Sequence, residues 1–181
     1  MTAEDKRIAK VAELSSKTFD KHVITQDLNQ GVFRSWHCAR PQASAYWFRV
    51  TTWPGHFAIT GDVGDFVWCR EHDMLPWVRS AIGSVSYFAE KVVAGDTKEY
   101  DATVFAEKIS GMLSPTSYGD GENDTIQKFL ETTDFTDQHG ASQAYYDSDL
   151  YQGDFPSTQN YCHDFLWCRE ALKWWLTKVE P

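Results

Sequence analysis

The fold is decided by the stretch Tyr46-Trp-Phe-Arg-Val-Thr-Thr-Trp53, Pro54-Gly55, His56-Phe-Ala-Ile-Thr60. Its two longer runs are rich in aromatic and β-branched residues, which favour strands. The Pro-Gly pair between them is typical of a tight turn. A link this short joins antiparallel strands, because a parallel crossover needs about a dozen residues. The stretch therefore predicts a β-hairpin.

Two similar runs extend the hairpin on either side, Phe33-Arg-Ser-Trp36 before it and Asp65-Phe-Val-Trp-Cys-Arg70 after it. Arg40-Pro41 and Gly61-Asp-Val-Gly64 supply the remaining turns. Together these runs predict an antiparallel meander of about four strands over residues 33–70. Because apolar side chains alternate onto both faces of the central strand, we expect helices to cover at least one face.

Helices are predicted before and after the meander in the sequence. The first spans residues 3–21, and a helical, acidic part spans 73–181. Asp73 and Ser84 are suited to cap helices, and Gly95 is suited to end the helix that Ser84 begins. Asp101 opens a further segment with helical spacing. The last helix carries an apolar seam with spacings of three and four, formed by Tyr161, Phe165, Cys168, Leu172, Trp175 and Val179. The fold class is therefore α+β, in a single domain spanning residues 1–181.

Composition indicates a soluble intracellular protein. No apolar run approaches the ~20 residues that cross a bilayer, and the first residues lack the apolar core of a secretory signal. The four cysteines show no C-x-x-C spacing, which favours free buried thiols in a reducing compartment. Most of the eight tryptophans are expected in the core, since large aromatic side chains are mostly buried.

Charge is distributed unevenly along the chain. Residues 96–164 hold fourteen acidic residues against three lysines, a net of −11, whereas the remainder has a net of +2. Direct nucleic-acid binding through the acidic segment is disfavoured, because phosphate contacts need lysine and arginine. An acidic surface serves either solubility or docking to a basic partner.

The candidate catalytic residues are His56, Asp62, Asp65 and His72, which cluster in sequence around one hairpin. If they converge, they provide carboxylates and an imidazole for a general base or a hard cation. The alternative is turn chemistry, in which the aspartates bond to nearby backbone. No zinc-ligand spacing or common enzyme motif is present, so we expect no bound metal and no cofactor and favour a non-enzymatic protein.

The aromatic meander suggests a further alternative. Arg34, Arg40, Arg49 and Arg70 accompany its rings, and aromatic platforms with arginines bind nucleobases. Core packing explains the same rings without a ligand. A nucleotide-binding or metal-dependent enzyme that uses the hairpin of His56, Asp62 and Asp65 is therefore the second functional hypothesis.

One set of motifs resembles a family of uncharacterised bacteriophage and prophage proteins. It comprises Thr52-Trp-Pro-Gly-His-Phe-Ala-Ile-Thr-Gly-Asp62, Phe66-Val-Trp-Cys-Arg70 and the terminal Phe165-Leu-Trp-Cys168. The resemblance covers the meander and the last helix and brings no established activity. It implies a small phage accessory protein in the cytoplasm of a bacterial host, of a kind that often redirects host machinery or blocks host defence.

The leading hypothesis combines this resemblance with the charge. It is an interaction protein, anti-CRISPR-like in action, that docks an acidic surface on the basic nucleic-acid-binding surface of a host protein. The predicted binding residues are Tyr145, Tyr146, Asp147, Asp149, Tyr151 and Asp154. We expect no membrane partner. A third hypothesis is a structural or regulatory phage protein that forms a homodimer through the helix of Trp174 and Trp175.

Overall fold

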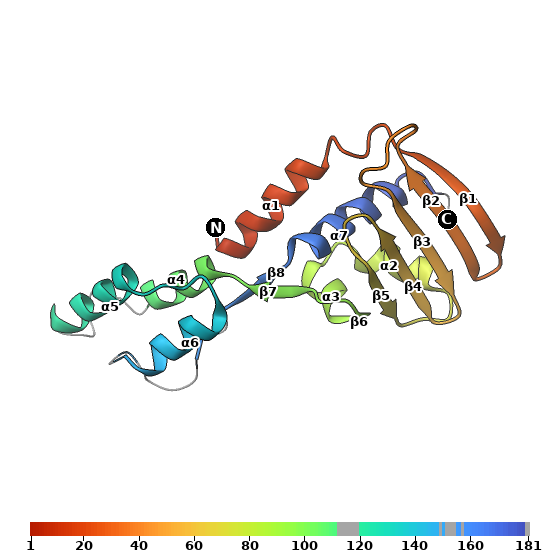
Figure 1. Ribbon diagram of the computed structural model, residues 1–181. Helices are drawn as coiled ribbons and strands as arrows, with labels where there is room; N and C mark the ends of the chain where they lie inside the picture. The colour runs from red at the N-terminus through yellow and green to blue at the C-terminus, as the bar shows by residue number, and fades with distance from the viewer. Residues whose placement is uncertain (112–119, 149, 151–154, 157, 180–181) are drawn as a thin grey trace. The chain divides into compact units, whose positions relative to one another are not determined.

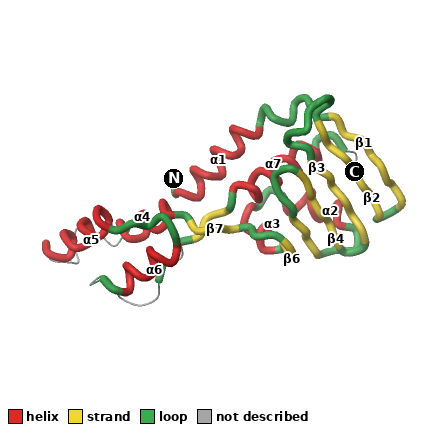
Figure 2. The backbone as a smooth tube through the Cα atoms, in the orientation of Figure 1, coloured by secondary structure: helices red, strands yellow, loops and turns green. Residues whose placement is uncertain are grey.

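The computed structural model describes residues 1–111, 120–148, 150, 155–156 and 158–179. The strands and helices follow one another along the chain as drawn in Figures 1 and 2. Their bounds are α1 Ala3–Ser15, β1 Val23–Gln30, β2 Phe33–Ala39, β3 Phe48–Trp53, β4 His56–Gly61, β5 Phe66–Cys69, α2 Met74–Ala81, α3 Val85–Glu90, β6 Val92–Ala94, β7 Lys98–Tyr100, α4 Ala102–Ser110, α5 Asp120–Thr132, α6 Gln138–Tyr146, β8 Gln159–Tyr161 and α7 His163–Leu176. Their mixture confirms the α+β class.

Six strands form one antiparallel sheet in the order β1-β2-β3-β4-β5-β6. Trp53 pairs with His56 across the Pro-Gly turn, as the hairpin prediction requires. The turn glycine, Gly55, has φ +79°, a conformation that glycine adopts without steric cost. The strand count of about four was too low, because the strands that form the two edges, β1 and β6, were missed.

The tryptophan-rich core lies against the inner face of this sheet. Trp175 of α7 packs on Trp36, with ring centroids 5.0 Å apart, and Trp68 stacks on Phe88 of α3 at 4.6 Å. Five of the eight tryptophans are buried, which confirms that most are core residues: Trp36, Trp68, Trp77, Trp167 and Trp175. Trp174, one of the two tryptophans of the proposed homodimer contact, packs on Phe19 within the chain. The homodimer hypothesis stays a prediction.

The helix caps predicted at Asp73 and Ser84 are confirmed, and Asp101, where a helical segment was expected to open, is a third cap. Asp73, Ser84 and Asp101 each accept a hydrogen bond from a backbone N–H in the first turn of α2, α3 and α4. Two predicted ends were wrong, since the first helix stops at Ser15 and the helix capped by Ser84 stops at Glu90. Short strand β6 follows the second of these helices and pairs with β5.

Two arginines join α2 and α7, each donating to carbonyl oxygens at the C-terminal end of the other helix. Arg169 of α7 is almost fully buried and donates to the carbonyl oxygens of Ile82 (2.9 Å) and Gly83 (3.1 Å) just beyond α2. Arg79 of α2 donates to the carbonyl oxygens of Leu176 (3.3 Å) and Val179 (2.6 Å) at the end of α7. Each guanidinium satisfies carbonyls that lack helical partners.

Internal contacts divide the chain into two compact units. One, the sheet unit, contains residues 7–97 and 161–181, and the other, the acidic unit, contains residues 1–6 and 98–160. The acidic unit has a small core of its own, around Phe105, Ile109, Ile126, Phe129 and Tyr145. The sequence-based expectation that residues 1–181 fold as a single domain stays a prediction.

None of the helices in the described part of the chain is long and apolar enough to cross a membrane.

Candidate functional site

The predicted catalytic residues fall at two ends of the sheet rather than at one point. His56 opens β4 and Asp62 follows its last residue, so the six-residue rise of the strand, about 20 Å, separates them. The turn that carries His56 lies beside His72, because the Gly55 N–H donates to the His72 carbonyl at 3.0 Å. The strand register thus brings His56 near His72, and Asp62 near Asp65, but it does not bring the histidines to the aspartates.

Polar atoms of His56, Asp62 and Asp65 have structural partners. The imidazole Nδ1 of His56 lies 3.1 Å from the Pro54 carbonyl oxygen, and its ring stacks on Trp53 with centroids 5.1 Å apart. Asp65 accepts a hydrogen bond from the Gly61 N–H at 3.1 Å. These contacts are the turn chemistry that the sequence offered as the alternative. In the described residues, no group of three or more histidines, cysteines, aspartates or glutamates is placed to hold a metal ion.

Asp62 fixes an unusual backbone conformation in the loop before β3. Tyr46 has φ +64°, a left-handed value that is rare for a large side chain. Its N–H donates to Asp62 at 2.7 Å, and its carbonyl oxygen accepts from His22 Nε2 at 2.9 Å. Tyr46 is 43% exposed, and its ring packs on Trp167. This clamp joins residues distant in sequence, so no local pattern predicts it.

The outer face of the sheet carries polar and aromatic groups that remain partly exposed. Strand alternation places Phe33, Arg49, Trp53 and His56 on this face, and Phe33 is 49% exposed. Arg49 forms an ion pair with Asp27, the extra residue of a bulge in β1, and donates to Ser35 at 2.8 Å. Its charge is thus already matched, which reduces its availability to a phosphate.

The acidic unit contains most of the negative charge of the chain. It has fourteen acidic residues and four lysines, a net of −10, whereas the sheet unit has thirteen basic and twelve acidic residues, a net of +1. Acidic side chains on α4, on α5 and on the segment from 134 to 147 are exposed, namely Glu107, Asp124, Glu131, Asp134, Asp137 and Asp147. The charge division read from the sequence therefore coincides with a division into compact units.

The predicted binding residues fall into three groups. Tyr146 and Asp147, at the end of α6, are exposed, with the tyrosine 47% accessible. Tyr145 is 2% exposed and belongs to the small core, so its ring is not available at the surface. Asp149, Tyr151 and Asp154 lie outside the described residues.

Three aspartates surround Tyr100, a grouping that sequence reasoning missed. The pKa of Tyr100 is raised, first by partial burial and then by the negative charges of Asp137, Asp101 and Asp134. The tyrosine hydroxyl donates to the Phe135 carbonyl oxygen at 2.8 Å. Asp101 and Asp137 cap helices α4 and α6, so their suitability as helix caps was the sequence feature that could have identified part of this group.

Comparisons with protein-family models, with curated proteins and with solved structures find no match to the chain.

Proposed function

We propose that this chain is a non-enzymatic accessory protein that binds a basic partner protein through its acidic unit. The observation that carries the proposal is the coincidence of charge and architecture. A net of −10 gathers on one compact unit while the other is nearly neutral. Charge added only for solubility has no physical reason to be confined to one unit, whereas a docking surface requires it.

The chemistry of the exposed groups favours a protein partner over a nucleic acid. Carboxylates at Asp124, Glu131 and Asp147 repel phosphates and attract lysine and arginine side chains. Exposed Tyr146 adds an aromatic surface of the kind that is enriched in protein interfaces. A basic channel that normally holds nucleic acid presents the complementary charge.

The resemblance to phage proteins suggests where such a partner occurs. We infer a host protein with a nucleic-acid-binding surface, CRISPR effectors included, in the bacterial cytoplasm. The competing hypothesis of an enzyme or nucleotide-binding hairpin has less support, because His56 and Asp62 lie at opposite ends of β4.

Affinity capture from bacterial lysate with paired charge-reversal variants tests the proposal. The test variant carries Asp124→Lys, Glu131→Lys and Asp147→Lys, which raises the net charge of the acidic unit by six. We avoid Asp101 and Asp137, because both cap helices. The matched control carries Glu13→Lys, Asp20→Lys and Glu71→Lys, at exposed positions of the sheet unit.

We expect wild type and the control to capture the same basic protein at low salt and to release it at high salt. The test variant should capture at least about tenfold less, which corresponds to about 1.4 kcal/mol. Equal capture by the two triple variants, or capture that salt does not weaken, would contradict docking through the acidic unit.

A further inference from the structure

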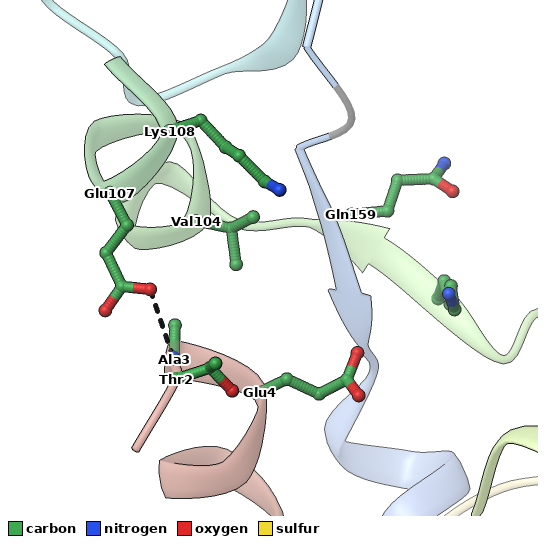
Figure 3. A pocket seen from close by; sticks show the side chains of 8 residues that line it. Thr2, Ala3, Glu4, Val104, Glu107, Lys108 and Gln159 are labelled. Atoms are coloured by element: carbon green, nitrogen blue, oxygen red, sulfur yellow. Dashed lines mark hydrogen bonds between the residues drawn. The ribbon is translucent and has the colours of Figure 1, made fainter. Parts of the chain in front are cut away.

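A cavity of about 460 Å³ lies within the acidic unit. Its walls are the first turn of α1, the side of α4, and the two short strands β7 and β8 (Figure 3). Pockets that hold small molecules in proteins have volumes of about 300–1,000 Å³. The cavity is therefore large enough for a compact organic ligand.

Contacts inside the unit hold two of its walls together. Glu107 of α4 accepts a hydrogen bond from the Ala3 N–H at 3.1 Å, drawn as the dashed line in Figure 3. The same carboxylate lies 3.7 Å from the Nζ atom of Lys6. Glu107 thus anchors the first turn of α1 to α4, and its charge is used within the protein.

Two opposite charges that line the cavity lack such partners. In the described part of the chain, neither Glu4 nor Lys108 makes an ion pair or a side-chain hydrogen bond, whereas Lys98 has an interaction of its own. Figure 3 shows Lys108 reaching from α4 on one side of the cavity and Glu4 from α1 on the other, with Val104 between them. The two charges face a shared space without neutralising each other.

These charges restrict the class of ligand. A simple anion would meet Glu4 and a unit whose net charge is −10, and a simple cation would meet Lys98 and Lys108. A neutral apolar molecule would remove both charges from water without compensation, which is unfavourable. A small zwitterion satisfies both walls, with its ammonium at Glu4 and its carboxylate at Lys108.

We propose that this cavity binds a small zwitterion of the amino-acid type. Val104 and Ala3 offer apolar contact to the methylene groups that separate the two charges of the ligand. The site goes beyond partner docking and does not depend on it, because capture of a basic protein requires only the exposed carboxylates.

Isothermal titration with a short series of ligands tests the site. The probes are glycine, 4-aminobutyrate and 6-aminohexanoate, with butylamine and butyrate as single-charge controls. We expect at least one amino acid to bind the full chain with one-to-one stoichiometry, and each single-charge control to bind at least about tenfold more weakly. No binding by any of the three amino acids, or equal binding by a single-charge control, would overturn the proposal.

Matched variants locate the binding. Glu4→Gln and Lys108→Met should each weaken the best amino acid at least about tenfold, whereas Glu13→Gln and Lys128→Met, at exposed positions outside the cavity, should leave it unchanged. The exchange Glu4→Lys with Lys108→Glu restores one charge of each sign and should recover binding. Thermal unfolding confirms that each variant is folded. Unchanged affinity in both single variants would also overturn the assignment.

Discussion

At the scale of the residue, Asp62 was a candidate catalytic residue, but in the structure it stabilises a loop conformation. Its carboxylate holds the N–H of Tyr46, whose left-handed conformation costs about 1 kcal/mol for a residue with a β-carbon. His22 holds the carbonyl of the same residue from the other side. The aspartate thus stabilises a strained loop that presents an exposed tyrosine.

We expect Asp62→Ala to lower the free energy of unfolding by about 1–2 kcal/mol, because the Tyr46 N–H loses its acceptor. Glycine adopts the left-handed conformation freely, so the cost of Asp62→Ala should be smaller in a Tyr46→Gly background. Urea denaturation of the four proteins of this double-mutant cycle measures the coupling. Asp20→Ala, at an exposed position, is the control. A coupling of zero would show that Asp62 does not support the conformation of Tyr46.

A second residue, Asp73, predicts a dependence of stability on pH. Hydrogen bonds from Arg34 at 2.8 Å, and from the Leu75 N–H, lower the pKa of the Asp73 carboxyl against the opposing effect of its partial burial. A lowered folded-state pKa gives stability above the unfolded pKa of about 3.9 and loses it as the pH falls through the folded value.

Asp73→Asn should therefore cost about 1 kcal/mol at neutral pH, since the pair is partly exposed and asparagine still caps α2. The difference from wild type should shrink as the pH falls below about 4. Urea denaturation at neutral pH and at about pH 3 gives both values. A difference that stays constant over this range would assign the effect to the cap and not to the ion pair.

At the scale of the element, local signals predicted much of the fold and tertiary pairing decided the rest. The Pro-Gly hairpin and the caps at Asp73, Ser84 and Asp101 are short-range chemistry, and all are present. Strand β1 was missed because its sequence, VITQDLNQ, is polar and its side chains are mostly exposed. Strand β6 was missed because its three residues become a strand only by pairing with β5.

The same limit applies to the candidate site. His56 and Asp62 are six positions apart in the sequence, so a tight turn between them would have brought their side chains together. The structure places strand β4 between them, and an extended strand holds them at its opposite ends. By contrast, the charge division was visible in the composition, because it requires no contact information. Its coincidence with a compact unit was not visible, since residues 1–6 join that unit from the far end of the chain.

The reciprocal contacts of α2 and α7 predict the largest single stability effect. Arg169→Leu should lower the free energy of unfolding by about 3 kcal/mol, because it leaves the buried Ile82 and Gly83 carbonyls without their donor and removes one of the two cations that bind Glu170. Arg169→Lys keeps the charge but not the planar fork, so it should lose an intermediate amount.

Guanidinium denaturation measures these changes, with Lys178→Ala at an exposed position as the control. A loss of less than about 0.5 kcal/mol for Arg169→Leu, within the range of ordinary surface substitutions, would contradict a stabilising role for the arginine.

At the scale of the whole molecule, the chain combines two units of different character. The sheet unit has a tryptophan-rich core and is nearly neutral, and the acidic unit has a small aromatic core under a strongly negative surface. A small core stabilises weakly, so the carboxylates add repulsion where there is little stability to offset it. Such a concentration of charge is expected where a basic partner neutralises it on binding.

Hydrogen–deuterium exchange on the complex with the captured partner tests this central claim most directly. The acidic-docking proposal predicts that amides in α4, α5 and α6 gain protection when the partner binds, while the outer strands of the sheet exchange as they do in the free protein. Protection confined to residues 23–69, with α4, α5 and α6 unchanged, would contradict it and would assign binding to the sheet instead.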